Sequence, residues 1–576
     1  MGLLNSSLQI GRSAILSYES ALQTIGNNIG NVGNADYTRL VPQLDPIQGV
    51  PIAGGLQPGA GVALTDIQRH LDEALEARLR LAIGARESAF AQQGAMVQVE
   101  VLFDDLNGTG VSSQMTRFFQ SFDELQNTPD NAAIRDLVVM NGVQLSDSLR
   151  GLRGQLGALG EALDSEIVAV VAQADEVASQ IARLNGQITT AEAGRRGQAN
   201  ALRDQRDALL RELSQFFDVA VREQPDGAIN VYVGSETLIQ GDINRGLVAV
   251  TEVSDGFKRT SVRFADTNQQ VAFSEGRLAG LITSRDEYAY GRIASLDELA
   301  AVLIAEVNRI HADGQGLVGF QTVVGTHDLL STDVPLDDSA AGLAFPPDGG
   351  SFYITVADDA TGTPLAYRID IDLNGSENDT TLESLVEEIN AQVSGVTASI
   401  TVDNRFMLSA DEGFSFTFGH DGQEARSDTS GVLAALGINT LLAGTDAGNI
   451  AVNENVLEDS SFLAAASNFL PGDGANAGRI AALDSEVIER LNGQSIPVLH
   501  NTMSSSVAVT ASGVNANMDA ADTILSALRA QRESISGVNL DEEAISLLKF
   551  ERAFQGAARY IRVVDDLLAE LVLLVR

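Results

Sequence analysis

The sequence predicts a multidomain α+β protein with long coiled-coil-like helices at its ends and in its core, a small β subdomain and an inserted, mainly β domain. Two observations predict this class. Apolar residues recur with heptad spacing at both ends and in the first half of the chain, and short alternating runs fill two internal segments. At 576 residues and 60.7 kDa, the chain has room for about three or four domains.

Residues 1–66 are predicted to form an amphipathic helix followed by an extended connector. The residues with heptad spacing are Leu8, Ile15, Leu22 and Ile29, with Ile25 in the second apolar register. Gly and Asn gather at residues 30–34, so we expect the helix to end there. Prolines follow at Pro42, Pro46, Pro51 and Pro58, and they predict extended or turning backbone to about Leu64.

Residues 537–576 are predicted to form a second terminal helix. Its heptad residues are Leu547, Phe554, Ile561 and Leu568 in one register and Phe550, Val564 and Leu571 in the other. Asp541, Glu542 and Glu543 suit the positive end of the helix dipole. A single amphipathic helix cannot bury its apolar stripe alone, so both terminal helices need each other or copies in other molecules. These twelve terminal residues form the predicted assembly interface.

The helical core is predicted to span residues 67–316 and to return at residues 451–536. Leu156, Leu163 and Val170 belong to a third heptad seam, and Val507, Val514 and Leu528 to a fourth. Short β-like runs with turn residues predict a small β subdomain at about 219–262. Helical spacing then resumes from Gly276 to about Ala312.

Residues 317–450 are predicted to form the inserted, mainly β domain. They carry 21 acidic residues against three arginines, a net charge of −18. The predicted strands are 352–356, 367–371, 398–402 and 414–418, with one helix at 382–393. Residues 1–66 and 537–576 each carry a net charge of only −2. Near-neutral ends can pack against copies of themselves, whereas the acidic insert favours solvent.

Composition excludes several classes of function. The 78 acidic and 37 basic residues give a net charge of −41, which disfavours nucleic-acid binding and anionic membrane surfaces. The absence of cysteine excludes disulfides, thiolate metal sites and cysteine nucleophiles. The longest apolar run, 567–575, contains Glu570 and is shorter than the roughly 18–20 residues of a membrane span. We therefore expect no nucleic-acid partner and no membrane insertion.

No motif in the sequence predicts catalysis, a cofactor or a metal site. The five histidines are never closer than 16 residues and lack metal-ligand spacing, so we expect solvated or packing roles. Residues 472–478 form a Gly-rich segment that lacks the Lys-Ser/Thr of a P-loop and the final glutamate of an EF-hand. We interpret it as a turn that opens a helix at Ile480.

Several motifs resemble those of the axial proteins of the bacterial flagellum, the rod, hook and hook-associated proteins. Residues 8–15 (LQIGRSAI), 26–32 (GNNIGNV) and 37–39 (YTR) resemble their N-terminal signature. Residues 536–543 (SGVNLDEE) and 550–558 (FERAFQGAA) are similar to the C-terminal motif of the hook-associated protein 1 family, and 202–210 and 273–281 to its core helices. The family usually has Pro-Gly before the tyrosine, where this chain has 34–36 (NAD). The insert is unmatched.

The resemblance implies an extracellular structural subunit of the hook–filament junction, exported unfolded through the flagellar type III apparatus. Its implied partners are copies of itself in a ring, the hook protein, the next junction protein and an export chaperone at the C-terminal region. Two alternatives stay open. In the first, the chain is another axial protein, of hook or rod type. In the second, it is a secreted adhesin or filament-associated enzyme whose function lies in residues 317–450.

Overall fold

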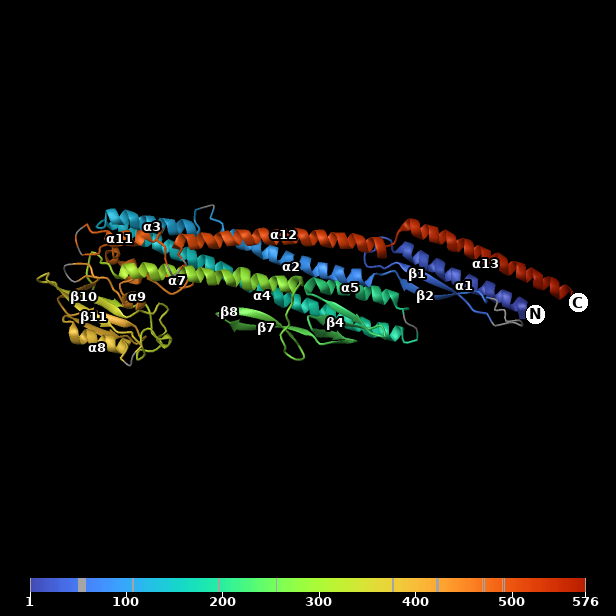
Figure 1. Ribbon diagram of the computed structural model, residues 1–576, viewed down its shortest axis with the longest axis horizontal. Coiled ribbons are helices and arrows are strands. Elements are labelled where there is room, and N and C mark those ends of the chain that lie inside the picture. Colours follow the sequence, from blue (N-terminus) through green and yellow to red (C-terminus); the bar gives the residue numbers. More distant parts are fainter. Residues whose placement is uncertain are drawn as a thin grey trace. The chain divides into compact units, whose positions relative to one another are not determined.

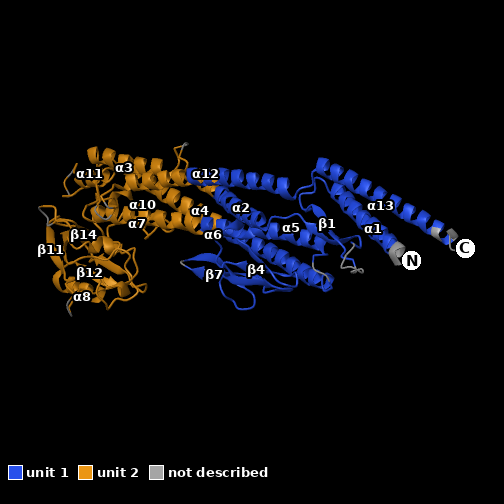
Figure 2. Ribbon diagram, turned by 45° about the vertical axis from the view of Figure 1, so that its right-hand side comes forward, with its two compact units in different colours: residues 1–95, 161–285, 512–576 blue, residues 96–160, 286–511 orange. Residues whose placement is uncertain are grey.

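The computed structural model describes residues 2–49, 59–105, 108–194, 197–254, 256–375, 378–420, 424–468, 470, 472–488, 491 and 493–574. The fold is α+β, with long helices and several small sheets, as the sequence predicted. The chain divides into two compact units (Figure 2). Unit 1 holds residues 1–95, 161–285 and 512–576, and unit 2 holds 96–160 and 286–511. The five domain boundaries inferred from composition stay predictions.

Both ends of the chain are long helices, α1 (Gly2–Gly30) and α13 (Leu540–Leu574), and they lie side by side in Figure 1. Helix α1 ends within the predicted stretch, and Gly33 follows with a φ of 80° that favours glycine. The acidic residues Asp541, Glu542 and Glu543 occupy the first turn of α13, as predicted.

The connector after α1 is a β-hairpin. Strands β1 (Leu40–Pro46) and β2 (Val62–Arg69) pair antiparallel, with a register shift at Gln43. The sequence predicted extended backbone here but not the strand pairing. Pro42 and Pro46 lie in β1, and prolines in a segment argue against a strand unless it is an edge strand. Pro51 and Pro58 lie outside the described residues.

Long helices form the remaining frame of unit 1, and three of them, α2, α4 and α12, also contribute residues to unit 2. Their bounds are α2 (Glu73–Phe103), α4 (Ala132–Ala191), α5 (Asn200–Phe216), α6 (Gly276–Thr283) and α12 (Ile496–Ser536). One small apolar cluster joins Leu79 and Ile83 of α2 to Leu525 of α12. Gly280 allows α6 to approach α2 closely, because a Cβ there would lie 2.4 Å from the Ser88 carbonyl oxygen.

The small β subdomain has two separate sheets. Strands β3 (Ala220–Glu223), β4 (Ile229–Val233), β5 (Glu236–Gln240) and β6 (Ile243–Asn244) form a four-stranded antiparallel sheet. Strands β7 (Leu247–Ser254) and β8 (Phe257–Phe264) form a two-stranded hairpin. The strands begin at Ala220 and end at Phe264.

The predicted helix from Gly276 to Ala312 has three parts. Helix α6 continues as a π-helical segment, η1 (Ser284–Tyr290), and then as α7 (Gly291–Ala312). Unit 2 also contains α3 (Val111–Asn127), which packs against α11 (Ala475–Ala482). Gly474 precedes α11, so the Gly-rich segment opens this helix five residues earlier than predicted.

The insert contains two three-stranded sheets around one apolar core. The first has the order β11 (Pro364–Ile371), β10 (Gly350–Asp358), β14 (Phe414–Phe418), and the second β12 (Val396–Ile400), β13 (Phe406–Ala410), β9 (Thr322–Val324). Helix α8 (Leu382–Gln392) matches its prediction. The shorter elements are η2 (Ser339–Ala341), α9 (Val432–Ala435), β15 (Leu442–Ala443) and β16 (Ala451–Val452).

The segment between the insert and α12 contains little helix. Between residues 451 and 495 the described segments hold only α10 (Glu454–Glu458), a 3-10 turn η3 (Ser460–Phe462) and α11, and α12 begins at Ile496. Gly474, which precedes α11, lies against α3, because a Cβ there would lie 2.2 Å from the Gln126 carbonyl oxygen. Among the described residues, we find no helix with the length and apolar character of a membrane span.

Candidate functional site

The terminal helices form an antiparallel pair. Gly11 of α1 meets Ile561 of α13, and Tyr18 meets Phe550 with ring centroids 6.3 Å apart. The two helices therefore run in opposite directions along their contact (Figure 1). The pairing expected between the two ends thus occurs within one chain.

Gly11 is a notch that lets the two helices approach. A Cβ at this position would lie 2.4 Å from Ile561 Cγ1 and 3.1 Å from its Cδ1, and 3.3 Å from Tyr560 Cδ1. The first distance is shorter than carbon atoms tolerate, so any side chain here forces the helices apart. Gly11 sits in the apolar register of α1, and the structure gives the reason for a glycine there.

The predicted interface residues occupy different environments. Ile25 and Val564 are buried, with 2% and 4% of their surfaces exposed. Eight others are half-buried: Leu8, Ile15, Leu22, Ile29, Phe550, Phe554, Ile561 and Leu568. Leu547 is exposed at 37%, and the side chain of Leu571 lies outside the described residues. Their contacts with other molecules stay a prediction.

The β1–β2 hairpin covers another side of α1. The Ser17 hydroxyl donates to the Val62 carbonyl at 3.1 Å and accepts from the Leu64 N–H at 3.1 Å. Gly61 passes so close to α1 that a Cβ there would lie 2.3 Å from Ser13 Oγ. Sequence reasoning missed Ser17, because a serine among apolar residues gives no signal of a strand partner 45 residues away.

Asn28 joins the end of α1 to both neighbouring elements. Its amide nitrogen donates to the Leu40 carbonyl at 2.8 Å and to Glu543 Oε2 at 3.0 Å. Its amide oxygen accepts from the Tyr37 hydroxyl at 2.7 Å and from the Leu40 N–H at 3.0 Å. The side chain is 1% exposed, so all four bonds are shielded from water. Burial, with Asp204 and Glu543 nearby, raises the pKa of Tyr37 to about 12.

Glu543 is the acceptor that fixes the start of α13. Its side chain is 2% exposed and receives Arg39 Nε at 2.7 Å as well as the Asn28 amide. Arg39 also reaches Glu542 at 2.8 Å, and its backbone N–H donates to the Ser536 carbonyl at 3.0 Å. This buried acid is 515 residues from Asn28 in sequence, so the network closes the two ends of the chain on each other.

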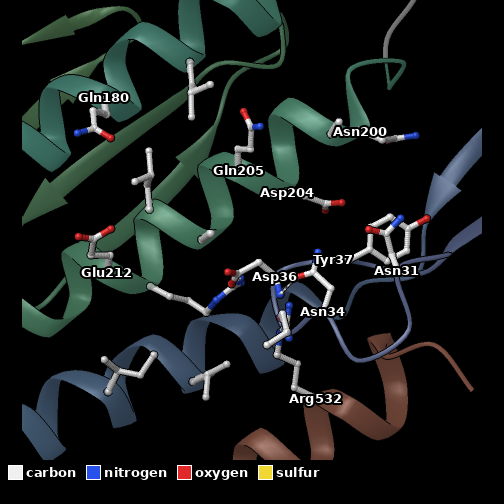
Figure 3. Close-up of a pocket in the computed structure, with 18 of the residues that line it drawn as sticks. Asn31, Asn34, Asp36, Tyr37, Gln180, Asn200, Asp204, Gln205, Glu212 and Arg532 are labelled. Atoms are coloured by element: carbon white, nitrogen blue, oxygen red, sulfur yellow. Dashed lines mark hydrogen bonds and ion pairs between the residues drawn. The ribbon is translucent and has the colours of Figure 1, made fainter. Parts of the chain in front are cut away.

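Residues 31–39, which we call the elbow, connect α1 to β1 and line a polar hollow of about 1350 Å³. Asn34 takes the place of the family's Pro-Gly pair: its side-chain oxygen accepts from the Asp36 N–H at 3.1 Å and its carbonyl from the Tyr37 N–H at 3.2 Å. Figure 3 shows these elbow residues on one side of the hollow and Asp204 on the other.

Two arginines hold the elbow to the helices of unit 1. Arg211 of α5 pairs with Asp36 at 2.9 Å, and Arg532 of α12 donates to the Ala35 carbonyl at 2.7 Å. Both arginines also reach the buried Glu76 of α2, Arg532 at 2.6 Å and Arg211 at 3.3 Å. The elbow is therefore anchored mainly by charged hydrogen bonds rather than by apolar packing.

Helix α13 has a second apolar face that nothing in the described chain covers. Its residues are Ile545, Leu548, Val563 and Leu567, and their exposed fractions run from 48% to 68%. At about 100° per residue they lie on the side of α13 opposite Phe554 and Ile561. Heptad reasoning missed this face, because it selected a single seam. We call these four residues the outer face of α13.

The described residues show no chemical centre. No group of three or more His, Cys, Asp or Glu side chains among them is placed to hold a metal ion. His311, which is fully buried, has a packing role: its Nδ1 donates to the Asn439 carbonyl at 2.8 Å, and its Nε2 accepts from the Ala464 N–H at 2.9 Å. Burial lowers the pKa of His311 to about 4.

Comparison with known proteins places the chain among flagellar components. Three family models match it: the flagellar hook-associated protein FlgK helical domain at residues 96–324, the flagellin hook IN motif at 351–412, and the flagellar basal body rod FlgEFG protein C-terminal region at 529–573. The flagellar hook-associated protein 1 of Escherichia coli is 26% identical, covering 99% of this chain and 100% of the relative. The proteins of the same name from Salmonella typhimurium and Bacillus subtilis are 25% and 23% identical, each over 98% of this chain and over 99% and 97% of their own lengths.

Over nearly its whole length, this chain is similar to flagellar hook-associated proteins 1. A solved structure of the flagellar hook junction protein FlgK from Burkholderia pseudomallei shares its fold, with a TM-score of 0.50 at 17% identity, over 80% of this chain and all of that one. The rod-type C-terminal match covers the end of α12 and most of α13. The hook IN motif match corrects the expectation that the insert is unmatched.

Proposed function

We propose that this chain is a structural subunit of the junction between the flagellar hook and filament, exported to the cell exterior. The outer face of α13 carries the proposal. A helix that is apolar on two sides has one side for α1 and one for another molecule, and exposed apolar patches of this kind mark assembly surfaces. The nearly neutral ends of the chain reduce the electrostatic cost of bringing such helices together.

Within this proposal, the twelve predicted interface residues and the outer face of α13 have different roles. Those in contact between α1 and α13 shape the helix pair, and the outer face of α13 contacts neighbouring copies in a ring. The hook protein and the next junction protein are the axial neighbours. An export chaperone covers the C-terminal region before assembly, because α13 exposes apolar surface whenever its partners are absent.

The alternatives find less support. A rod-type or hook-type protein shares the C-terminal match, but the hook-associated helical-domain match and the near-full-length relatives favour the junction subunit. The proposal includes no enzymatic role, since the similar proteins are structural parts of the flagellum. The hook IN motif in residues 351–412 favours a flagellar role for the insert over an unrelated adhesin or enzyme.

Deletion of the gene tests this function. Electron microscopy of the deletion strain should show hooks without attached filaments, and the intact gene should restore filaments. Filaments attached normally to hooks in the deletion strain would exclude the junction role.

A matched pair of adjacent valines tests the assignment of the two faces. Val563 belongs to the outer face and is 57% exposed, whereas Val564 faces α1 and is 4% exposed. Val563→Asp should leave the helix pair intact but block filament attachment, because the charge must be buried on assembly at a cost of several kcal/mol, about 2–5. Val564→Asp should separate α13 from α1 in the isolated protein. Normal filaments with Val563→Asp would refute the assignment.

A further inference from the structure

In the β7–β8 hairpin, residues alternate regularly between those that bond the other strand and those whose backbone groups point away from the hairpin. Thr251 and Thr260 face each other, and the ladder runs without a bulge from Leu247–Phe264 to Ser254–Phe257. In an antiparallel pair, alternate facing residues direct their N–H and C=O groups away from each other. The bonding of Thr260 therefore reveals which residues of β7 point outward.

The outer edge of β8 is already satisfied. The Thr260 N–H donates to Asp164 Oδ1 of α4 at 2.8 Å, and the Thr260 carbonyl accepts from Arg285 at 2.6 Å. Two further outward bonds are Val271 N–H to the Val262 carbonyl at 2.8 Å and Phe264 N–H to the Gln269 carbonyl at 2.9 Å. Because these even-numbered residues of β8 point outward, their facing partners on β7, the odd-numbered ones, also point outward.

The outer edge of β7 is satisfied only at its beginning. The Leu247 N–H donates to Asp175 Oδ1 of α4 at 3.0 Å. Further along, the outward groups belong to Ala249, Thr251 and Val253, and their backbone N–H and C=O groups meet no partner among the described residues. Three residues thus present a ready template for an incoming strand.

This edge lacks the usual protection against strand addition. It has no proline and no bulge, and its one charged residue, Glu252, is paired with Arg263 of the same hairpin at 2.7 Å. Other long edges in the described chain are protected: β11 begins with Pro364 and carries Arg368 and Asp370, and β12 is bonded at Ala398 by the Asn390 side chain. The outer edge of β11 also leaves Ala366, Arg368 and Asp370 without a backbone partner, but two of these three positions carry charged side chains, whereas the open positions of β7 carry none.

We propose that the β7 edge accepts a strand from a second copy of this chain. The charge balance favours that occupant, because residues 247–264 hold three basic and two acidic residues in a chain of net charge −41. A weakly positive hairpin attracts an otherwise acidic copy. Asp164, Arg285 and Asp175 hold the hairpin against α4, so the edge is rigid before binding. The proposal rests on the proposed function, in which a ring brings copies together.

Proline substitution tests the edge without touching the hairpin ladder. Thr251→Pro removes an N–H that points outward, so the hairpin should fold and the protein should melt as the wild type does. Loss of hydrogen bonds to the added strand should lower the number of cells with attached filaments by about tenfold or more. Thr251→Val, which removes the hydroxyl bond to Thr260 but keeps the N–H, should behave as wild type.

Controls separate this proposal from the proposed function. Glu252→Pro removes an inward N–H and should weaken the hairpin itself, which a fall in melting temperature would report. If the deletion strain lacks filaments but Thr251→Pro restores them fully, the edge proposal is wrong and the junction role stands. If the deletion strain keeps its filaments, the junction role itself fails.

Cross-linking identifies the occupant. Val253 is 75% exposed at the open edge, so p-benzoylphenylalanine can replace it in the full-length chain. Irradiation of intact flagella should yield a cross-linked product containing two copies of this chain. A product with a different protein alone, or no product, would overturn the proposal.

Discussion

Gly11→Ala should weaken the terminal helix pair, although alanine usually stabilises a helix. In an open helix, Gly→Ala gains about 1 kcal/mol. At Gly11 the added Cβ lies 2.4 Å from Ile561 Cγ1, and relieving such overpacking costs about 1–3 kcal/mol. The net expectation is a loss of about 0–2 kcal/mol in the stability of the α1–α13 pair. Hydrogen–deuterium exchange of α1 amides in the full-length chain measures it.

A control on the same helix sharpens this prediction. Gly26 is exposed, and a Cβ there would meet nothing within 4 Å, so Gly26→Ala should increase protection of α1. Ile561→Ala removes the atom that clashes, and the double variant Gly11→Ala/Ile561→Ala should be more stable than the sum of the single effects by about 1–3 kcal/mol. Equal gains in protection from Gly11→Ala and Gly26→Ala would refute the close approach of the helices.

Three further expectations concern buried groups. Glu543→Ala should loosen the start of α13 by about 2–4 kcal/mol, because the buried Asn28 amide and the half-buried Arg39 guanidinium lose their acceptor, and faster amide exchange at residues 540–545 would report it. His311, whose pKa is lowered to about 4, favours the folded state while neutral, so stability should fall by about 3 kcal/mol as the pH drops from 6.5 to 4. Melting curves should show this loss in the wild type and not in His311→Gln. Gly276→Ala should cost about 3 kcal/mol or more, since its φ is 88° and a Cβ would lie 2.4 Å from backbone, whereas Gly234→Ala, in open space, should cost about 1 kcal/mol in the same melting assay.

The sequence predicts the terminal helices well, because heptad spacing is a local signal that survives without tertiary information. It also predicts the acidic first turn of α13. It does not predict that Glu543 accepts from Arg39 and Asn28, since a charge near a helix start has many possible partners. The sequence does not predict the β1–β2 pairing for a related reason. The register of this pair depends on Ser17 and on turn residues rather than on an alternation of apolar and polar residues.

The two faces of α13 show the limit of pattern reasoning most clearly. Heptad spacing selects Phe554 and Ile561, and the structure uses Ile561 within the chain, against Gly11. The apolar residues of the outer face, such as Val563 and Leu567, do not recur at a regular spacing. In the sequence they therefore look like scattered apolar residues on an exposed surface. Only the position of α1 shows that these residues are left uncovered on one side of a helix already buried on the other.

The location of the protein on the flagellum tests the central claim most directly. Val402 is fully exposed, at 100%, in the turn between β12 and β13, so an epitope inserted after it should leave the fold intact. Immunogold electron microscopy of cells carrying this variant as their only copy should place the label in one narrow band where hook meets filament. Label distributed along the filament or confined to the base of the hook would contradict the junction role.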